Sequence, residues 1–158
     1  MDIRDINITT PEASFTYRAA ALIIRDNKLL AAKNINTPYY TIGGAVEINE
    51  TSAEAAIREV YEETGLRMEI DRLAFVQERF LKVGGQKYHE VVFFYLMKPG
   101  GINIPDGTVT DQVSETLHWL PLNELAKFDL VPEFLKTAPL VNITHTQHII
   151  SSEGTPCK

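Results

Sequence analysis

The segment from Gly44 to Leu66 constrains the fold more than any other part of the chain, because it predicts a helix with both ends marked. Thr51 and Glu54 form a Ser/Thr-x-x-Glu capping box, in which the threonine caps the helix and the glutamate reaches back. Gly65 supplies the left-handed residue at which helices commonly end. We therefore expect a helix over about residues 52–64. Its apolar side chains recur at helical spacing and predict one buried stripe, made of Ala53, Ala56, Ile57, Val60 and Thr64.

Three glutamates share one side of this predicted helix and face away from the apolar stripe. Glu59, Glu62 and Glu63 stand at i, i+3 and i+4, which places their carboxylates within about 100 degrees of one another. Like charges at this spacing oppose the helix, so a bound dication is a natural compensation. Mg²⁺ and Mn²⁺ prefer oxygen ligands and suit such a face. The alternative is a solvated acidic surface with no ligand.

The surrounding residues resemble the Nudix box at every defining position. Gly44 is followed after five residues by Glu50 and, after seven more, by Arg58-Glu59-Val60-Tyr61-Glu62-Glu63-Thr64-Gly65-Leu66. The preceding Gly43-Gly44-Ala45-Val46-Glu47 and the later Trp119-Leu120-Pro121-Leu122-Asn123-Glu124-Leu125 resemble the flanks usual in the same family. The resemblance covers about residues 15–140.

This resemblance implies an α/β fold, the Nudix α/β/α sandwich around a mixed β-sheet. It also implies hydrolysis of a nucleoside diphosphate linked to another moiety, with Mg²⁺ as cofactor and Mn²⁺ as the alternative. Metal ions suit the chemistry because they neutralise phosphate oxygens and activate water. On the matching positions, Glu59 and Glu63 are the implied metal ligands, assisted by Glu62 and the Gly43 carbonyl. Glu62 is also a candidate catalytic residue.

Two further residues of the box are candidates for the catalytic machinery. Arg58 matches the family arginine that orients the neighbouring glutamates, as a guanidinium fork allows. Its alternative role is an exposed pair with Glu54, one helical turn away. Glu50 stands just before the helix, where a carboxylate also suits the helix dipole, so a catalytic and a structural role both remain open.

Members of the family usually recruit another acidic residue from outside the helix. Glu90 is our first candidate, ahead of Glu115 and Asp111, because it opens the strongly apolar strand predicted over residues 90–97. An unpaired carboxylate there is costly unless a metal or Arg58 compensates it. We therefore expect the Glu90 side chain to point at the glutamate cluster. The alternative is an ordinary polar residue at the edge of the sheet.

Three residues are candidates for contacts with the substrate. Arg18 and Arg79 carry guanidinium groups that suit phosphates, and Tyr40 offers an aromatic face on which a base can stack. Each also has a structural alternative, as a surface strand residue for the arginines and as a core residue for Tyr40.

The substrate that fits the sequence first is a nucleoside triphosphate, cleaved to a nucleoside monophosphate and pyrophosphate by a small MutT-like enzyme. A nucleoside diphosphate sugar or ADP-ribose is the second choice. A non-catalytic Nudix module that senses a ligand is a third reading. The intact Arg-Glu-x-x-Glu-Glu core argues against that module.

Composition restricts the partners and the compartment. The formal net charge of −6 over 158 residues argues against a nucleic-acid polymer as partner. The single cysteine, Cys157, excludes an internal disulfide and fits a reducing cytoplasm. No signal peptide or membrane-spanning segment is apparent, so we expect a cytoplasmic monomer or homodimer that does not bind membranes.

The rest of the chain predicts one domain over residues 1–158, with its core at about residues 15–140. Residues 19–24 and 29–32 predict a hairpin, and residues 39–42, 73–76 and 116–120 predict further strands. The Gly- and Pro-containing stretch Pro99 to Gln112 predicts a long loop that is mobile without ligand. The tail at residues 150–158 is expected to be flexible.

Overall fold

The structure is a computed structural model that describes residues 4–110 and 114–154. It contains one α-helix, α1 (Ser52–Thr64), and two short 3₁₀ helices, η1 (Leu122–Lys127) and η2 (Glu133–Lys136), among these residues. The strands are β1 (Asn7–Thr9), β2 (Ala13–Leu22), β3 (Ile24–Arg25), β4 (Lys28–Lys33), β5 (Tyr39–Ala45), β6 (Ile70–Val83), β7 (Gln86–Met97), β8 (Thr108–Val109), β9 (Thr116–Pro121), β10 (Leu130–Val131) and β11 (Gln147–Gly154).

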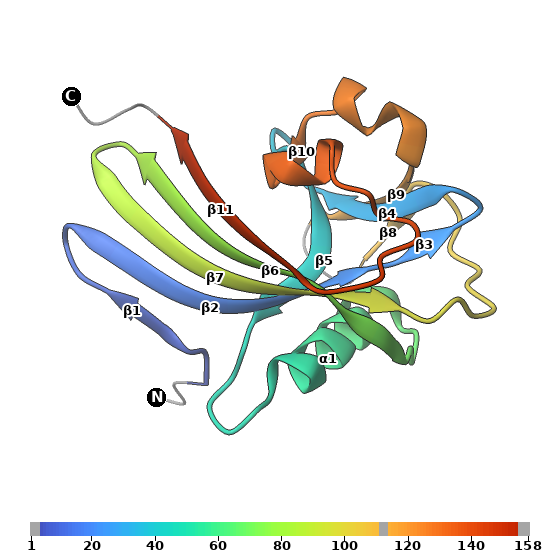
Figure 1. The fold of residues 1–158 in the computed structure, drawn as a ribbon, viewed down its shortest axis with the longest axis horizontal. Coiled ribbons are helices and arrows are strands. Elements are labelled where there is room, and N and C mark those ends of the chain that lie inside the picture. The colour runs from blue at the N-terminus through green and yellow to red at the C-terminus, as the bar shows by residue number, and fades with distance from the viewer. Residues whose placement is uncertain (1–3, 111–113, 155–158) are drawn as a thin grey trace.

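The strands form one mixed, strongly curved sheet in the order β11-β6-β7-β2-β5-β4-β9-β8, with β1 on β2, β10 on β5 and β3 on β4 (Figure 1). Its β2–β7, β6–β11 and β5–β10 pairs are parallel, and the remaining pairs are antiparallel. The predicted α/β class with a mixed sheet is confirmed. The predicted hairpin is also confirmed, because β3 and β4 are joined at Asp26 and Asn27, both of which have positive φ angles.

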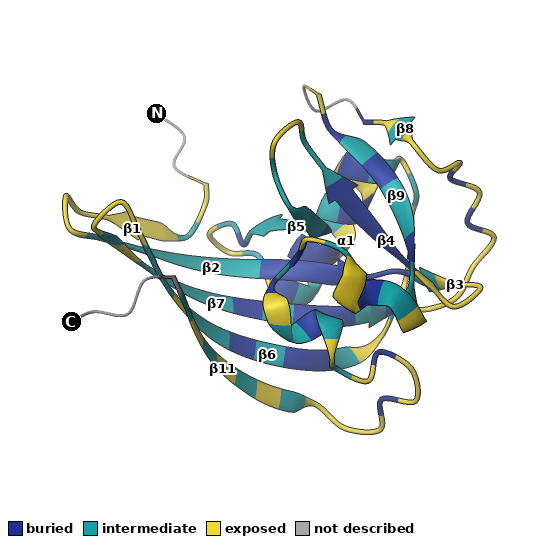
Figure 2. Ribbon diagram, turned by 90° about the horizontal axis from the view of Figure 1, so that it is seen from above, coloured by how far each residue is buried: buried dark blue, intermediate teal, exposed yellow. Residues whose placement is uncertain are grey.

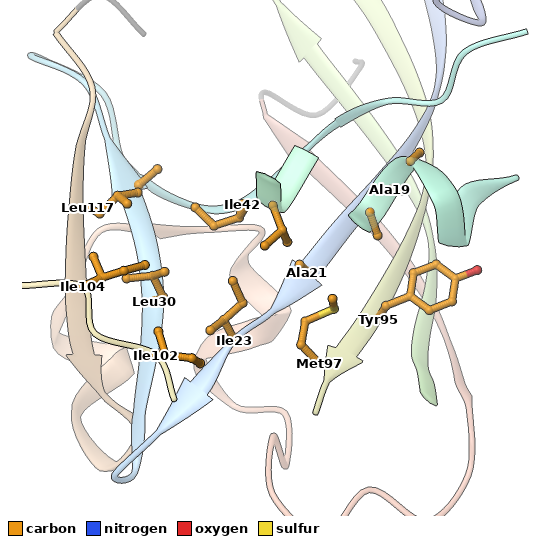
Figure 3. Packing of buried hydrophobic residues seen from close by; sticks show 14 of the residues in the cluster. Ala19, Ala21, Ile23, Leu30, Ile42, Tyr95, Met97, Ile102, Ile104 and Leu117 are labelled. Atoms are coloured by element: carbon orange, nitrogen blue, oxygen red, sulfur yellow. The ribbon is translucent and has the colours of Figure 1, made fainter. Parts of the chain in front are cut away.

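Two apolar clusters cover the two faces of the sheet, as the burial pattern in Figure 2 indicates. One cluster lies between the sheet and α1, and Figure 3 shows that it includes Ala19 and Ala21 of β2 and Ile23, the residue after β2. The other lies on the opposite face, under η1, η2 and β10. Alternate residues of β2 therefore serve different cores, as the pleat of a strand requires. The layer over this second face consists of 3₁₀ turns and extended chain.

Helix α1 begins and ends where the sequence predicts, but its buried face is rotated by about one residue. The capping box is present, and Gly65 at φ 73° caps the C-terminus. The predicted Ile57 is 38% exposed, whereas Ser52, Ala55 and Glu63 are buried with Ala56 and Val60. The two polar side chains, Ser52 and Glu63, can be buried because both have hydrogen-bond partners. The Ser52 hydroxyl bonds to the Tyr95 hydroxyl, and Glu63 accepts from a backbone amide of β5.

The expectation of a mobile loop over residues 99–112 is wrong for its described part. Ile102 and Ile104 are buried in the cluster on the α1 side, and the Trp119 indole donates to the Ile104 carbonyl at 2.8 Å. β8 then adds to the edge of β9. Two isoleucines at strand spacing thus anchor the segment against the core. Asp111 and Gln112 lie outside the described residues.

The expectation of a flexible tail from residue 150 is also wrong as far as residue 154. β11 pairs parallel with β6 from Gln147↔Phe75 to Gly154↔Lys82, and backbone hydrogen bonds therefore order this segment. The rest of the predicted tail, residues 155–158, lies outside the description. In the part of the chain that is described, no helix has the length and apolar character needed to cross a bilayer.

Candidate active site

The turn from β5 into α1 brings the backbone of one element against a carboxylate of the other. Gly44 pairs with Ala19 of β2, whose side chain belongs to the core on the α1 side. A Cβ atom at Gly44 would lie 2.2 Å from Oε1 of Glu59. Glycine leaves room for the Glu59 carboxylate, which a side chain at this position would displace.

Glu63 is the most deeply buried carboxylate of the helix. Its Oε1 accepts from the Gly43 amide at 3.1 Å, and its Oε2 is buried without a hydrogen-bond partner among the described residues. Burial, followed by the negative charge of Glu115, raises the pKa of Glu63 to about 8. Burial also raises the pKa of Glu59. The two side chains therefore form a cluster of carboxylates in which Glu63 keeps one buried oxygen without a hydrogen-bond partner among the described residues.

Arg58 binds three glutamates and the backbone at the same time. Its Nε and Nη2 donate to Glu50 at 2.8 and 3.0 Å, and its Nη1 donates to Glu59 at 2.8 Å and to Glu62 at 3.3 Å. Nη2 also donates to the Ala45 carbonyl at 3.0 Å. The hydrogen bonds between Arg58 and Glu50 raise the pKa of Arg58 above its usual value. They also lower the pKa of Glu50 below its usual value.

This network decides between the two roles considered for Arg58. Glu54 does not pair with Arg58, because its carboxylate accepts from the Thr51 backbone amide and hydroxyl at 2.8 Å in the capping box. Arg58 instead holds the carboxylates of Glu50, Glu59 and Glu62 in place. Glu50 therefore contacts the carboxylate cluster through Arg58.

Glu90 does not reach the cluster, so the expectation that it points there is wrong. In the sheet register Glu90 stands opposite Thr16 and Arg79, and its face is that of Val92 and Phe94, which pack on the side away from α1. Its carboxylate accepts from Arg79 at 3.2 Å. Successive strand residues alternate between faces, so the position of Glu90 on β7 sends it to the far side.

Glu115, our second candidate, is the acidic residue that the fold brings close. It is 6% exposed, and its two carboxylate oxygens accept from the Tyr40 hydroxyl at 2.6 Å and the Thr110 hydroxyl at 3.1 Å. Its negative charge contributes to the raised pKa of Glu63. Burial and the bond to Glu115 raise the pKa of Tyr40, so this phenol stays protonated and donates. Tyr40 is thus a partner of Glu115.

Arg18, Tyr40 and Arg79, the three predicted substrate contacts, line one cavity together with Gly43. This cavity, of about 240 Å³, lies on the sheet face away from α1 and reaches under Val131 and Pro132. The side chain of Arg18 has no hydrogen-bond or ion-pair partner among the described residues, and its charge acts to lower the pKa values of Glu59 and Glu63. A second cavity, of about 490 Å³, runs past Glu62 and Glu63 to Thr110.

The donor set fits a hard divalent cation. No three acidic, histidine or cysteine side chains stand in a ready ligating arrangement within residues 4–110 and 114–154, because Arg58 and the Gly43 amide engage the carboxylates. The buried, unpaired oxygen of Glu63 and the carboxylate of Glu59 nevertheless supply anionic oxygen beside Gly43. Mg²⁺ and Mn²⁺ bind such oxygens and would offset the repulsion between them.

Comparison with known proteins places this site in a family. The sequence matches the NUDIX domain over residues 15–141. A MutT-like protein of Streptomyces ambofaciens is 28% identical over 121 residues, which cover 75% of this chain and 71% of that protein. The mutator MutT protein of Bacillus halodurans has a similar structure, with a TM-score of 0.61 at 15% identity over 84% of this chain and 89% of that one. The MutT protein of Methanosarcina mazei Go1 gives a TM-score of 0.56 at 22% identity over 80% and 91%.

Proposed function

The chain belongs to the NUDIX domain family and is a Nudix hydrolase, and we propose that it cleaves a nucleoside triphosphate to a nucleoside monophosphate and pyrophosphate with Mg²⁺. The observation that carries this proposal is the buried carboxylate cluster beside Gly43, with one oxygen of Glu63 unpaired. A divalent cation would stabilise the ionised form of such a cluster, and a cation there can meet the phosphate oxygens of an anhydride.

We assign the metal to Glu59 and Glu63, with the Gly43 carbonyl and Glu62 assisting. Bound there, Mg²⁺ would neutralise phosphate oxygens and make a nearby water more acidic. Arg58 holds two of these carboxylates at fixed distances and so removes the cost of orienting them. Glu115 adds negative charge from the side of β9, and Tyr40 and Thr110 fix its direction.

Hydrolysis consumes one water and forms one new phosphorus–oxygen bond while the bond to the bridging oxygen breaks. The water must lose a proton, and a carboxylate within reach can accept it. Glu62 suits this step because its side chain is 47% exposed and lines the larger cavity beside Glu63. Arg18, free of protein partners, can meet the phosphates from the other side of Gly43.

The first prediction is that product release from nucleotides depends fully on a divalent cation. With Mg²⁺, incubation with nucleoside triphosphates should release pyrophosphate and a nucleoside monophosphate, measured directly by anion-exchange chromatography of the reaction mixture. Chelation of the metal should abolish the release. A panel that includes ADP-ribose and nucleoside diphosphate sugars, scored by phosphate released from their products by alkaline phosphatase, tests the second substrate class. Binding without turnover of any compound would instead indicate a ligand-sensing module.

The second prediction concerns Glu115. Glu115→Gln keeps the shape but removes the charge that faces Glu63, so we expect the Mg²⁺ concentration for half-maximal activity to rise about tenfold, as losses of supporting groups commonly do. The measurement is a Mg²⁺ titration of the initial rate. Glu124→Gln is the control, since Glu124 pairs with Lys127 on η1. An unchanged Mg²⁺ dependence in Glu115→Gln would remove Glu115 from the site.

A further inference from the structure

β11 lies beyond the residues that match the NUDIX domain, yet its side chains bind two residues of β6 that line the smaller cavity. The domain match ends at residue 141, whereas β11 covers Gln147–Gly154 and runs alongside β6 at the edge of the sheet (Figure 1). In this register, Ile149, Ser151 and Glu153 stand on the face of Gln77 and Arg79, two residues that line the cavity. β11 can therefore act on the cavity through β6.

Ser151 sets the direction of the Gln77 amide. Gln77 is completely buried, and its Nε2 donates to the Ser151 hydroxyl at 2.8 Å. Its Oε1 is buried without a partner among the described residues. With the amide nitrogen engaged by β11, the oxygen of Gln77 is left as a buried acceptor behind the wall of the cavity. A buried acceptor without a partner is costly, and a ligand donor would remove that cost.

Glu153 holds Arg79 in a similar way. Its Oε2 accepts from Nη2 of Arg79 at 2.7 Å, while Nη1 of Arg79 donates to Glu90 at 3.2 Å. The Nε of Arg79 is buried and unpaired within the described chain. Arg79 and Gln77 stand two residues apart on the same face of β6, so an unpaired donor and an unpaired acceptor are neighbours there.

The cavity is small, and the rest of its lining is partly polar, from Arg18, Tyr40, Thr41 and Glu90, and partly apolar. Val92 and Phe94 contribute buried apolar side chains, and Val131 and Pro132 line the opposite wall. A volume of about 240 Å³ is below the range of about 300–1,000 Å³ usual for whole ligands, so one compact group of a larger substrate fits. Apolar walls beside several hydrogen-bonding side chains match a flat heterocycle whose edge carries hydrogen-bond donors and acceptors.

We infer that this cavity binds the base of the nucleotide substrate, and that Ser151 and Glu153 of β11 are positioning residues that fix Gln77 and Arg79 for reading the edge of that base. The inference rests on the proposed nucleotide substrate. The cavity shares Gly43 and Arg18 with the surroundings of the carboxylate cluster, so a nucleotide can place its base here and its phosphates at Gly43. β11 thereby extends the family domain with a specificity element.

The test measures binding of reaction products without metal, so that it does not depend on catalysis. Titration calorimetry with chelator present compares AMP, GMP, CMP and UMP with ribose 5-phosphate, which lacks a base. At least one nucleoside monophosphate should bind the full chain about tenfold or more tightly than ribose 5-phosphate. Ser151→Ala and Glu153→Gln should each reduce this preference about tenfold, as the loss of one well-placed hydrogen bond to a ligand would. Binding of ribose 5-phosphate itself should be unchanged.

Matched controls separate this role from a structural one. Glu78→Gln breaks a pair between the same two strands, Glu78 with His148 at 2.8 Å, but on the other face of the sheet. Ser152→Ala changes an exposed serine next to Ser151. Both controls should keep the preference for the base. Equal binding of ribose 5-phosphate and all four monophosphates, or an unchanged preference in Ser151→Ala and Glu153→Gln, would overturn the inference. Cation-dependent release of pyrophosphate tests the proposed function separately.

Discussion

Replacing Glu63 by glutamine should lower the turnover number by at least about a hundredfold and, at the same time, stabilise the metal-free protein. Activity falls because Glu63 carries the one buried, unpaired carboxylate oxygen beside Gly43, and an amide oxygen is a far weaker ligand for Mg²⁺. Initial rates at saturating Mg²⁺ and nucleotide measure this effect.

Stability rises for the opposite reason, because the ionised carboxylate is unfavourable in the folded protein. The pKa of Glu63 is raised from 4.5 to about 8, mainly by burial. Between these pH values the folded state holds a proton that the unfolded state releases, so the free energy of unfolding falls as pH rises from about 4.5 to 8. Glu63→Gln removes this loss and should be more stable by about 2 kcal/mol at pH 8.

Thermal or urea unfolding at pH 6 and pH 8 in the presence of chelator measures this difference. The gain in Glu63→Gln over the natural sequence should be larger at pH 8 than at pH 6. Glu12→Gln, an exposed glutamate outside the matched domain, should change neither the rate nor the pH dependence. An active Glu63→Gln protein would show that this carboxylate holds no essential metal.

The sequence predicts α1 to the residue because its signals are local. The capping box at Thr51 and Glu54 and the stop at Gly65 depend only on backbone geometry within the helix. The buried face is not local. The spacing of the apolar residues is compatible with a buried face that includes Ile57 and with one that includes Ser52 and Glu63. The second face is buried in the structure, because Tyr95 of β7 and Gly43 of β5 supply hydrogen-bond partners for its two polar side chains.

Residues far apart in sequence account for the part of the site that the sequence does not predict. The sequence alone shows that Glu90, Val92 and Phe94 lie on one face of the same strand. Which face of the sheet packs against α1, however, depends on the order of the strands. Glu115 was a candidate with weaker support. Its role depends on Tyr40, 75 residues earlier in the chain.

β11 shows the same limit more strongly. Two isoleucines among polar residues give a weak strand pattern, and the strand exists because β6 offers a free edge more than 60 residues away, beginning at Ile70. Gln77, Ser151 and Glu153 therefore carried no functional signal in the sequence. The hydrogen bonds of Ser151 and Glu153 to residues of β6 exist only because the sheet register brings β11 beside β6.

Removing Arg58 should produce the largest loss of stability of any substitution in the site. Arg58→Met keeps most of the side-chain volume but leaves Glu50 and Glu59, each with a side chain only 15% exposed, without their cation. Loss of one partner from a largely buried ion pair costs about 3–5 kcal/mol, and the 24% exposure of Arg58 reduces this to about 2–4 kcal/mol. Turnover should fall as well, because Glu59 and Glu62 lose their orientation.

The pH dependence of this loss identifies its electrostatic part. Hydrogen bonds from Arg58 hold the pKa of Glu50 below its usual 4.5, so the stability they contribute is present above that pH and is lost as pH falls through the lower folded value. The difference in unfolding free energy between the natural sequence and Arg58→Met should therefore be largest near neutral pH and shrink below about pH 4.

The stability of Arg58→Lys should lie between those of the natural sequence and Arg58→Met. An ammonium group cannot bind Glu50, Glu59 and the Ala45 carbonyl in the way that the planar guanidinium does. Arg67→Met, which removes an exposed arginine that lies over the Tyr61 ring, is the matched control and should cost less than about 1 kcal/mol. Equal stability of Arg58→Met and the control would mean that the carboxylates around Arg58 are held by solvent and not by this guanidinium.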